Sequence, residues 1–184
     1  MRTPDRRSVP AGVVERGRSP VHVRVIRPTD ARELERFYAA LSPESRRTRF
    51  FSFGSELSHG QSVCFCTTDH DHREGFVAIV DGGPVGQERI VGHVCVEPDG
   101  GDTAEVAIAV ADEFHRRGIG RRLMAAGVAW ARRERIARFT ATMLASNAPI
   151  RGLLVALRLP TRVRLVGGGV AEVTIDLVGQ SVAA

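Results

Sequence analysis

The stretch with the clearest potential for chemistry lies at 104–123 and reads AEVAIAVADEFHRRGIGRRL. An apolar strand pattern runs into His115–Gly120, and an amphipathic helix pattern follows. Gly118 and Gly120 remove Cβ atoms where a ligand must approach the main chain. The first turn of a helix has N–H groups without intrahelical partners, and the helix dipole adds positive charge there. Four arginines surround this turn: Arg116, Arg117, Arg121 and Arg122. The pattern therefore predicts a site for an anion such as a pyrophosphate.

Other interpretations of the same turn are available. A tight turn beside a solvated arginine face explains the pattern without any ligand. The usual nucleotide motifs fit poorly, because the chain contains no lysine and hence no G-x-x-x-x-G-K-[ST] loop. It also has no G-x-G-x-x-G followed by an acidic residue about twenty positions later.

Length and composition indicate one intracellular domain. The 184 residues, 43% of them hydrophobic, are enough for a single core. No apolar run approaches the length of a membrane span, and the N-terminus has no apolar segment typical of a secretory signal. Cys64, Cys66 and Cys95 cannot all pair, which is consistent with reduced thiols in a cytoplasmic protein.

The charge is unevenly distributed. All 26 basic residues are arginines, and the net charge is +5. Residues 1–20 hold five arginines against Asp5 and Glu15, so this segment carries most of the excess. We expect a disordered basic tail over 1–20 and a folded domain over 21–184. A nucleic-acid partner is disfavoured, because the tail accounts for most of the charge.

Periodicity gives the expected order of elements. Strands alternate with helices in one unit around the glycine turn, and tight turns join the strands before it. This combination predicts a single α/β (α+β) domain. The expected elements are a strand at Val21–Arg27, helices at Ala31–Leu41 and Pro43–Phe51, a polar connection at Ser58–Arg73, strands at Gly75–Val80, Arg89–Val96 and Thr103–Val110, a helix from Gly118, a strand at Arg138–Leu144, a helix from Asn147 to Leu157, and a hairpin of Val163–Val166 with Val170–Leu177.

Several segments resemble one known family. H-R-R-G-I-G is similar to the Q/R-x-x-G-x-G/A acyl-CoA loop of the GNAT N-acetyltransferase superfamily. The resemblance covers most of 21–178, through IRPTDARELERFYAALSPESRRTRFFS, DHDHREGFVAIV, TAEVAIAVADEFHRRGIGRRL and RFTATMLASNAPI. Within the superfamily, these segments look like bacterial protein lysine acetyltransferases. The resemblance implies the GNAT fold: a central mixed, mostly antiparallel sheet of about seven strands, flanked by about four helices.

The resemblance implies acetyl-CoA as co-substrate and assigns residues to it. The backbone of the strand ending at Ile108, Ala109 and Val110 would contact the pantetheine arm. Amides from His115 to Gly120, including those of Arg116, Arg117, Gly118 and Ile119, would hold the pyrophosphate, with Arg121 beside them. Asn147 matches an asparagine that often contacts the cofactor in the family, although a helix N-cap explains it equally well.

Glu105 is the candidate general base. Attack on a thioester needs a neutral amine, whereas a lysine side chain has a pKa of about 10.4 in water. A carboxylate near the amine can accept that proton, and the resembling acetyltransferases carry a glutamate at this place. The alternative is a solvent-facing strand residue, since Ala104, Val106 and Ile108 share the opposite face. A backbone N–H near Ala107–Ala109 would hold the oxyanion.

Two departures from the family pattern concern the acid and the acceptor side. Many relatives have a tyrosine acid on the helix after the asparagine, but 151–159 contains none, and Tyr38 is expected to be a packing residue. Water could protonate the thiolate. Leu157–Pro160 replaces the Leu-Gly-Phe of relatives, and His115 stands where Gln or Arg is usual.

No metal site is expected. His59, His70 and His72 lack helical His pairing or a cysteine ligand set. The predicted function is transfer of an acetyl group to a primary amine, most plausibly a protein lysine, by direct attack in a ternary complex. The alternatives are an acyl-CoA-binding regulatory module of the same fold and a nucleic-acid binder. The resemblance also allows pairing of two copies.

Overall fold

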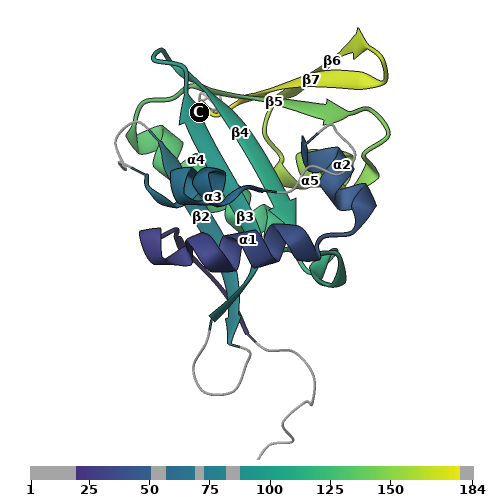
Figure 1. Ribbon diagram of the computed structural model, residues 1–184. Coiled ribbons are helices and arrows are strands. Elements are labelled where there is room, and N and C mark those ends of the chain that lie inside the picture. The colour runs from purple at the N-terminus through teal and green to yellow at the C-terminus, as the bar shows by residue number, and fades with distance from the viewer. Residues whose placement is uncertain (1–19, 51–56, 69–72, 82–87, 179–184) are drawn as a thin grey trace, which may run out of the picture.

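The computed structural model describes residues 20–50, 57–68, 73–81 and 88–178. The expected basic tail lies outside these ranges, apart from Pro20. Seven strands form one sheet in the order β1-β2-β3-β4-β5-β7-β6 (Figure 1). Only β4 and β5 run parallel, and every other pair is antiparallel. The strands are β1 (Val21–Val25), β2 (Glu74–Asp81), β3 (Glu88–Pro98), β4 (Thr103–Val110), β5 (Arg138–Leu144), β6 (Thr161–Gly167) and β7 (Val170–Asp176).

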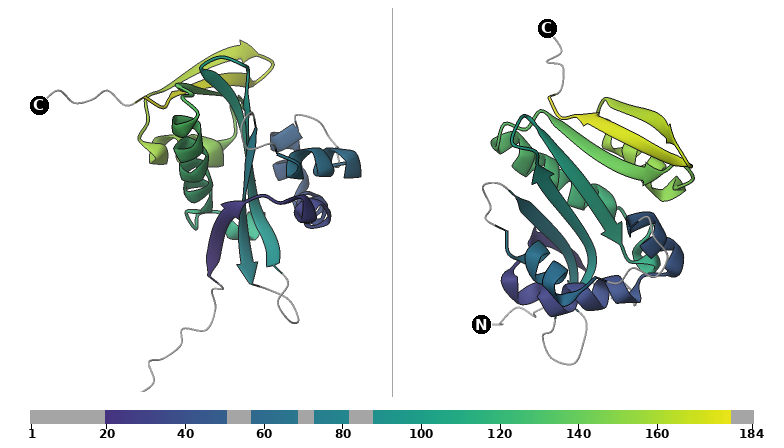
Figure 2. Two further views of the ribbon diagram at one scale, coloured as in Figure 1. Left: turned by 90° about the vertical axis from the view of Figure 1, so that its left-hand side faces the viewer. Right: turned by 45° about the horizontal axis from the view of Figure 1, so that its top comes forward.

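Helices cover both faces of the sheet. Figure 2 shows α4 and α5 on one face and α1, α2 and α3 on the other. The helices are α1 (Ala31–Ala40), α2 (Pro43–Phe50), α3 (His59–Cys66), α4 (Ile119–Arg133) and α5 (Ala148–Leu157). The expected mixed, mostly antiparallel sheet of seven strands is confirmed, and so is the β4-α4-β5 unit that brings two strands parallel.

Helix α3 corrects the expected polar connection over Ser58–Arg73. Its start carries a capping box: Ser58 Oγ accepts from the Gln61 N–H at 3.3 Å, and the Gln61 side chain accepts from the Ser58 N–H at 2.9 Å. Its inner side buries Ser62 and Cys66. The polar composition of this segment suggested a loop, but it forms a short helix with capped ends. The described residues therefore contain five α-helices, where about four were expected.

Two cores lie on the two faces. Strand alternation sends Ala104, Val106 and Ile108 towards α4 and α5, where they join the larger cluster. The smaller cluster lies beneath α1 and α3 and includes Tyr38, Leu34 and Val77. Odd-numbered residues of β4 face this second cluster, as the contact of Ala109 with it shows. The two faces of β4 therefore serve two separate layers.

Strands β4 and β5 separate soon after they meet. Their parallel pairing covers only Thr103–Glu105 against Arg138–Thr140. Beyond Glu105 the pairing register stops, although β4 continues to Val110 and β5 to Leu144. The middle of the sheet thus contains two facing strand edges whose ladder is interrupted, and this interruption positions the candidate site.

Candidate active site

The edge of β4 that faces β5 offers main-chain groups of even-numbered residues. Ala111 donates its N–H to the Val91 carbonyl, and Asp99 donates to the Thr103 carbonyl. Because antiparallel ladders alternate, the odd residues of β4 direct their N–H and C=O groups towards β3. Val106, Ile108 and Val110 consequently direct theirs towards β5, beyond the last β4–β5 pair at Glu105.

The strand register shows which of the backbone amides near Ala107–Ala109 is available as the oxyanion donor. The amides of Ala107 and Ala109 belong to the ladder with β3, which leaves Ile108 N–H as the amide of that trio on the open edge. The Val110 carbonyl on the same edge is taken, because His115 Nε2 lies 2.9 Å from it. Ile108 is therefore the central free position of this edge.

The start of α4 forms a cradle of amides. Gly118 is the N-cap with φ of 76°, in the left-handed region where a side chain is strained. Nothing lies within 4 Å of where its Cβ would stand, so the backbone conformation alone favours glycine there. The first intrahelical bond runs from Arg122 N–H to Gly118 C=O, which leaves the amides of Ile119, Gly120 and Arg121 without helical partners.

The loop before α4 is itself unusual in conformation. Arg116 has φ of 58°, which a non-glycine residue rarely adopts. Such strain often accompanies binding sites whose surroundings enforce it. The N–H of His115 donates to the Asp112 carbonyl at 3.1 Å. Of the amides from His115 to Gly120 that were expected to hold the pyrophosphate, those from Arg116 onward therefore remain available to a ligand.

Positive charge surrounds this cradle without internal compensation. Within the described ranges, no carboxylate forms an ion pair with Arg116, Arg117, Arg121 or Arg122. Arg117 instead lies over the ring of Phe114, with 4.6 Å between its Cζ and the ring centroid. Gly120 lies against Leu153 of α5, and a Cβ added at Gly120 would lie 3.4 Å from Leu153 Cδ2. Free amides and unpaired guanidinium groups together suit a diphosphate.

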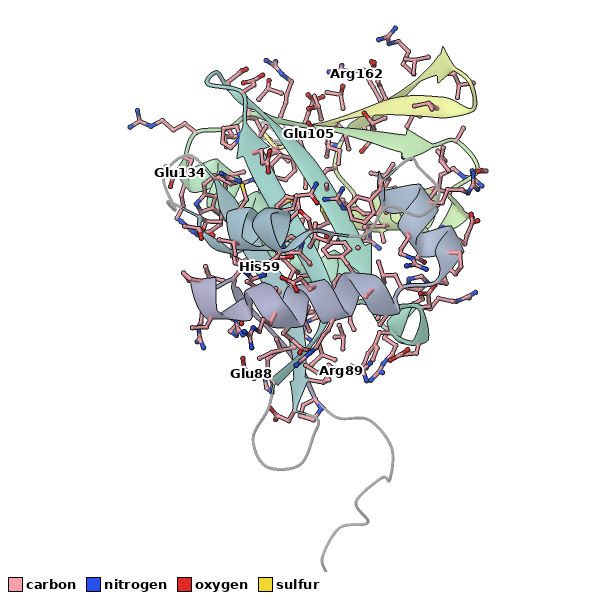
Figure 3. All side chains as sticks on the ribbon, viewed as in Figure 1. His59, Glu88, Arg89, Glu105, Glu134 and Arg162 are labelled. Atoms are coloured by element: carbon pink, nitrogen blue, oxygen red, sulfur yellow. The ribbon has the colours of Figure 1, made fainter. Side chains whose placement is uncertain are left out.

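Glu105 lies on the other face of β4. It is exposed, and it pairs with Glu97 of β3 in the register. Figure 3 shows it on the part of β4 near the turn from β3. Its neighbours on this face are Ala107 and Cys95, and the Cys95 thiol contacts the Ala107 carbonyl at 3.7 Å. The carboxylate thus lies where β4 and β5 still pair, immediately before they separate.

Asn147 caps α5. Its side-chain oxygen accepts from the Ile150 N–H at 3.1 Å, and its own N–H donates to the Leu144 carbonyl. The capping interpretation is confirmed. Contact with a cofactor remains a prediction, and it would use the amide nitrogen of the same side chain.

Helix α2 is held by the loop that leads to the cradle. The Asp112 carboxylate accepts from the Ser42 N–H at 3.0 Å, from Ser42 Oγ at 2.8 Å and from Ser45 Oγ at 2.7 Å. These hydrogen bonds lower the pKa of Asp112 although partial burial opposes them. Because α2 packs against both β4 and β5, Asp112 links that helix to the cradle segment.

Tyr38 is a core residue, as expected, and it packs against His93. The Tyr38 hydroxyl hydrogen-bonds with His93 Nδ1 at 2.9 Å beneath α1, and both side chains are buried. Burial raises the pKa of the Tyr38 hydroxyl. Tyr38 is thereby unsuited to donate a proton at the site.

Arg49 near the end of α2 was not singled out by sequence reasoning. Its Nη2 lies 3.8 Å from Cys95 Sγ, on the face of the sheet that carries Glu105. The segment SRRTRF suggests ordinary solvated arginines, and only the placement of α2 over β4 and β5 encloses one of them. No sequence signal separates Arg49 from Arg46 and Arg47.

Comparison with known proteins decides the family. The sequence profile of the acetyltransferase (GNAT) family matches residues 34–156, which is most of the described chain. The chain belongs to the GNAT acetyltransferase family. The GNAT domain of S. lividans PAT shares 28% identity with it, over 85% of this chain and 90% of that one, with a TM-score of 0.74.

Two more distant structures share the fold. A GNAT phosphinothricin acetyltransferase from Sinorhizobium meliloti, solved in complex with AcCoA, is 16% identical over 84% of this chain and 86% of that chain, with a TM-score of 0.65. The ribosomal-protein-S5-alanine acetyltransferase from Vibrio fischeri is 15% identical over 84% and 91%, with a TM-score of 0.64. This GNAT chain therefore shares its fold with a protein that was solved in complex with AcCoA.

The part of the chain that the structure describes contains no cluster of three or more His, Cys, Asp or Glu side chains able to hold a metal ion. His59 pairs with Glu35 at 2.6 Å, whereas His70 and His72 lie outside the described residues. None of the described helices is both long and apolar enough to cross a membrane.

Proposed function

We propose that this GNAT chain transfers an acetyl group from acetyl-CoA to a primary amine. The observation that carries the proposal is the pairing of an amide cradle at Gly118–Arg121 with the open β4 edge around Ile108. The cradle is suited to a diphosphate, and the edge offers an N–H to an added acyl chain. The two features lie on consecutive elements of one βαβ unit.

Glu105 acts as the base in this proposal. It accepts the proton of the acceptor ammonium, directly or through water, and the amine nitrogen attacks the thioester carbon. Ile108 N–H stabilises the negative charge that develops on the carbonyl oxygen. The nitrogen then gives up its second surplus proton to water, the C–S bond breaks, and the sulfur leaves as a thiolate that takes up a proton from solvent. No covalent enzyme intermediate is needed, because both substrates are bound together.

The acceptor proposed first is a protein lysine. Support comes from the resemblance of the sequence segments to bacterial lysine acetyltransferases and from the 28% identity with the GNAT domain of S. lividans PAT. The residues beside acetyl-CoA in this proposal are Ile108, Ala109, Val110, His115, Arg116, Arg117, Gly118, Ile119, Gly120, Arg121 and Asn147.

Glu105→Gln tests the base. We expect kcat with a lysine peptide to fall by roughly 10²- to 10⁴-fold at neutral pH, because the substituted amide cannot accept the proton. The dissociation constant for acetyl-CoA, measured by calorimetry, should change by less than about twofold. Glu97→Gln is the matched control, since Glu97 lies opposite Glu105 on β3, and it should retain activity. Unchanged turnover by Glu105→Gln would remove Glu105 from the mechanism.

A regulatory module that binds acyl-CoA without efficient transfer is the second candidate. It is favoured by one observation: α5 contains no tyrosine, and Tyr38 is buried in the core. Calorimetry with CoA and a broad amine panel separate the two functions. Binding of CoA without release of free thiol from acetyl-CoA for any amine would favour the module.

A further inference from the structure

Arg49 carries a charge that its surroundings do not neutralise. Its Nη2 contacts Cys95 Sγ at 3.8 Å, and its Cζ lies 6.0 Å from the ring centroid of Tyr38 and 5.1 Å from that of Phe50. The residue is half-buried, but its Nε is fully enclosed and has no hydrogen-bond partner. No carboxylate among the described residues lies within ion-pairing distance of it.

Neither of the two ionisable neighbours of Arg49, Cys95 and Tyr38, carries a negative charge. Burial raises the pKa of the Cys95 thiol, and it also raises that of the Tyr38 hydroxyl, so both groups stay neutral near pH 7. A largely enclosed guanidinium without a counter-ion is unfavourable, because it loses hydration without gaining an ion pair. An anion from outside the chain would supply both the charge and the missing hydrogen bonds.

The position of Arg49 relates it to the acceptor. Cys95 pairs with Ala107 in the β3–β4 register, and Glu105 is two residues earlier on the same face of β4. Two residues along a strand span roughly 7 Å. Ala107, which is partly buried, follows Glu105 on this face of β4. Arg49 and Glu105 therefore lie on the same face of the sheet, where α2 packs against β4.

We propose that Arg49 binds a carboxylate of the acceptor, on the face of the sheet that carries Glu105. This inference rests on the proposed function and defines its acceptor class. The carboxylate has two possible sources: the acceptor's own α-carboxylate, or an acidic side chain next to a lysine in a peptide. In both cases the planar guanidinium can donate two parallel hydrogen bonds to the two carboxylate oxygens.

Two matched pairs of acceptors test the proposal. One pair is Nα-acetyl-lysine and its C-terminal amide, which differ only in the α-carboxylate. The other pair is a lysine peptide flanked by Glu and the same peptide flanked by Gln. We expect wild-type kcat/KM to favour the carboxylate member of at least one pair by about tenfold or more. The pair that shows the preference identifies the source of the carboxylate.

Variants at Arg49 test whether this residue causes the preference for an acceptor with a carboxylate. Arg49→Gln should reduce it to less than about twofold, whereas Arg49→Lys, which keeps the charge, should retain part of it. Arg32→Gln is the control, because Arg32 is an exposed arginine on α1 and its loss changes the net charge equally. Far-UV circular dichroism verifies that each variant is folded. If Arg49→Gln does not fold, the partial loss of preference expected for Arg49→Lys provides the test.

A binding measurement separates this inference from the proposed function. Calorimetry on the CoA-loaded protein compares Nα,Nε-diacetyl-lysine with its C-terminal amide, and the Glu-flanked with the Gln-flanked acetylated peptide. Tighter binding of a carboxylate form by wild type but not by Arg49→Gln supports the carboxylate site, even if no amine is acetylated. Equal transfer to both members of both pairs would leave the acetyltransferase function in place and overturn the role of Arg49.

Discussion

His93 is enclosed in the core between β3 and α1, and its imidazole carries no charge at neutral pH. Burial lowers the pKa of His93 to about 3, and the nearby positive charge of Arg49 acts in the same direction. Its Nδ1 engages the Tyr38 hydroxyl, while its Nε2 is buried without a hydrogen-bond partner. Protonation of this ring would place a second positive charge beside Arg49, so the fold depends on its neutral form.

The protein should therefore lose stability in mildly acidic solution. Between the folded pKa of about 3 and the unfolded value of 6.5, the unfolded chain binds more protons. The contribution of His93 is thus complete above pH 6.5 and is lost as the pH falls. We expect the free energy of unfolding, measured in urea, to decrease by about 1.4 kcal/mol from pH 7.5 to pH 5.5 on account of this group.

His93→Asn is the matched variant, because its amide oxygen can still accept from Tyr38 and does not titrate. Its unfolding free energy should be lower than that of wild type at pH 7.5, since the smaller side chain leaves a cavity. Its value should nevertheless remain nearly constant down to pH 5.5. An equally steep loss in both proteins would assign the acid sensitivity to other groups.

At the level of single residues, the sequence singled out Glu105 and the glycines as candidates but not Arg49. Gly118 is visible in the sequence because the left-handed turn before a helix favours glycine, whereas Gly120 lies in the first turn of α4 against Leu153. Glu105 was found through resemblance, since alternation alone makes it a surface residue. The enclosure of Arg49 arises from how α2 packs on two strands distant in sequence, which local pattern does not encode.

Among the helices, the exit from α5 carries local strain. Arg158, the C-cap residue, has φ of 54°, in the left-handed region. The Leu-Gly-Phe of the family pattern that the sequence resembles would put a glycine here, and glycine adopts this conformation without a steric penalty. The chain therefore keeps the backbone geometry of that exit with a residue less suited to it.

Arg158→Gly should stabilise the protein. We expect the free energy of unfolding to rise by about 0.5–1 kcal/mol, because relief of the left-handed strain exceeds the added freedom of the unfolded chain. Chemical denaturation at neutral pH measures the change. Ala156→Gly is the control at another exposed position, two residues earlier in α5, and it should destabilise by a similar amount, since Ala156 lies within the helix. A destabilised Arg158→Gly would mean that the arginine side chain stabilises this end of α5.

At the level of elements, two strands were predicted to the residue, whereas one helix was missed. Thr103–Val110 and Arg138–Leu144 have the expected bounds, because apolar alternation ends there at clear turn residues. Helix α3 was missed, since its eight residues are too short for a periodic pattern and their polar composition suggested a loop. The interruption between β4 and β5 was equally hidden, because no residue type marks where pairing stops.

For the molecule as a whole, the β4–β5 joint is where the sheet is least continuous. All other neighbouring strands pair over five or more residues, whereas β4 and β5 pair over three. Strands β5, β7 and β6 are thus joined to the rest of the sheet by a short ladder, supported by α4 and α5 on one face. In our proposal the cofactor lies at this joint, so its binding should stabilise the entire fold and not one loop.

Acetyl-CoA should raise the melting temperature, and the diphosphate should account for much of the effect. At 100 times the dissociation constant, binding adds about 2.7 kcal/mol, or roughly 5–10 °C for a chain of this size. Dephospho-acetyl-CoA keeps the diphosphate and should give a comparable shift. Acetyl-pantetheine, at equal concentration, lacks the group that the amides of Ile119–Arg121 would hold and should give a much smaller shift.

Gly118→Ala should reduce the acetyl-CoA shift but not the acetyl-pantetheine shift, because strain at φ of 76° disturbs the cradle alone. Equal shifts with acetyl-CoA and acetyl-pantetheine would show that the start of α4 does not bind the diphosphate.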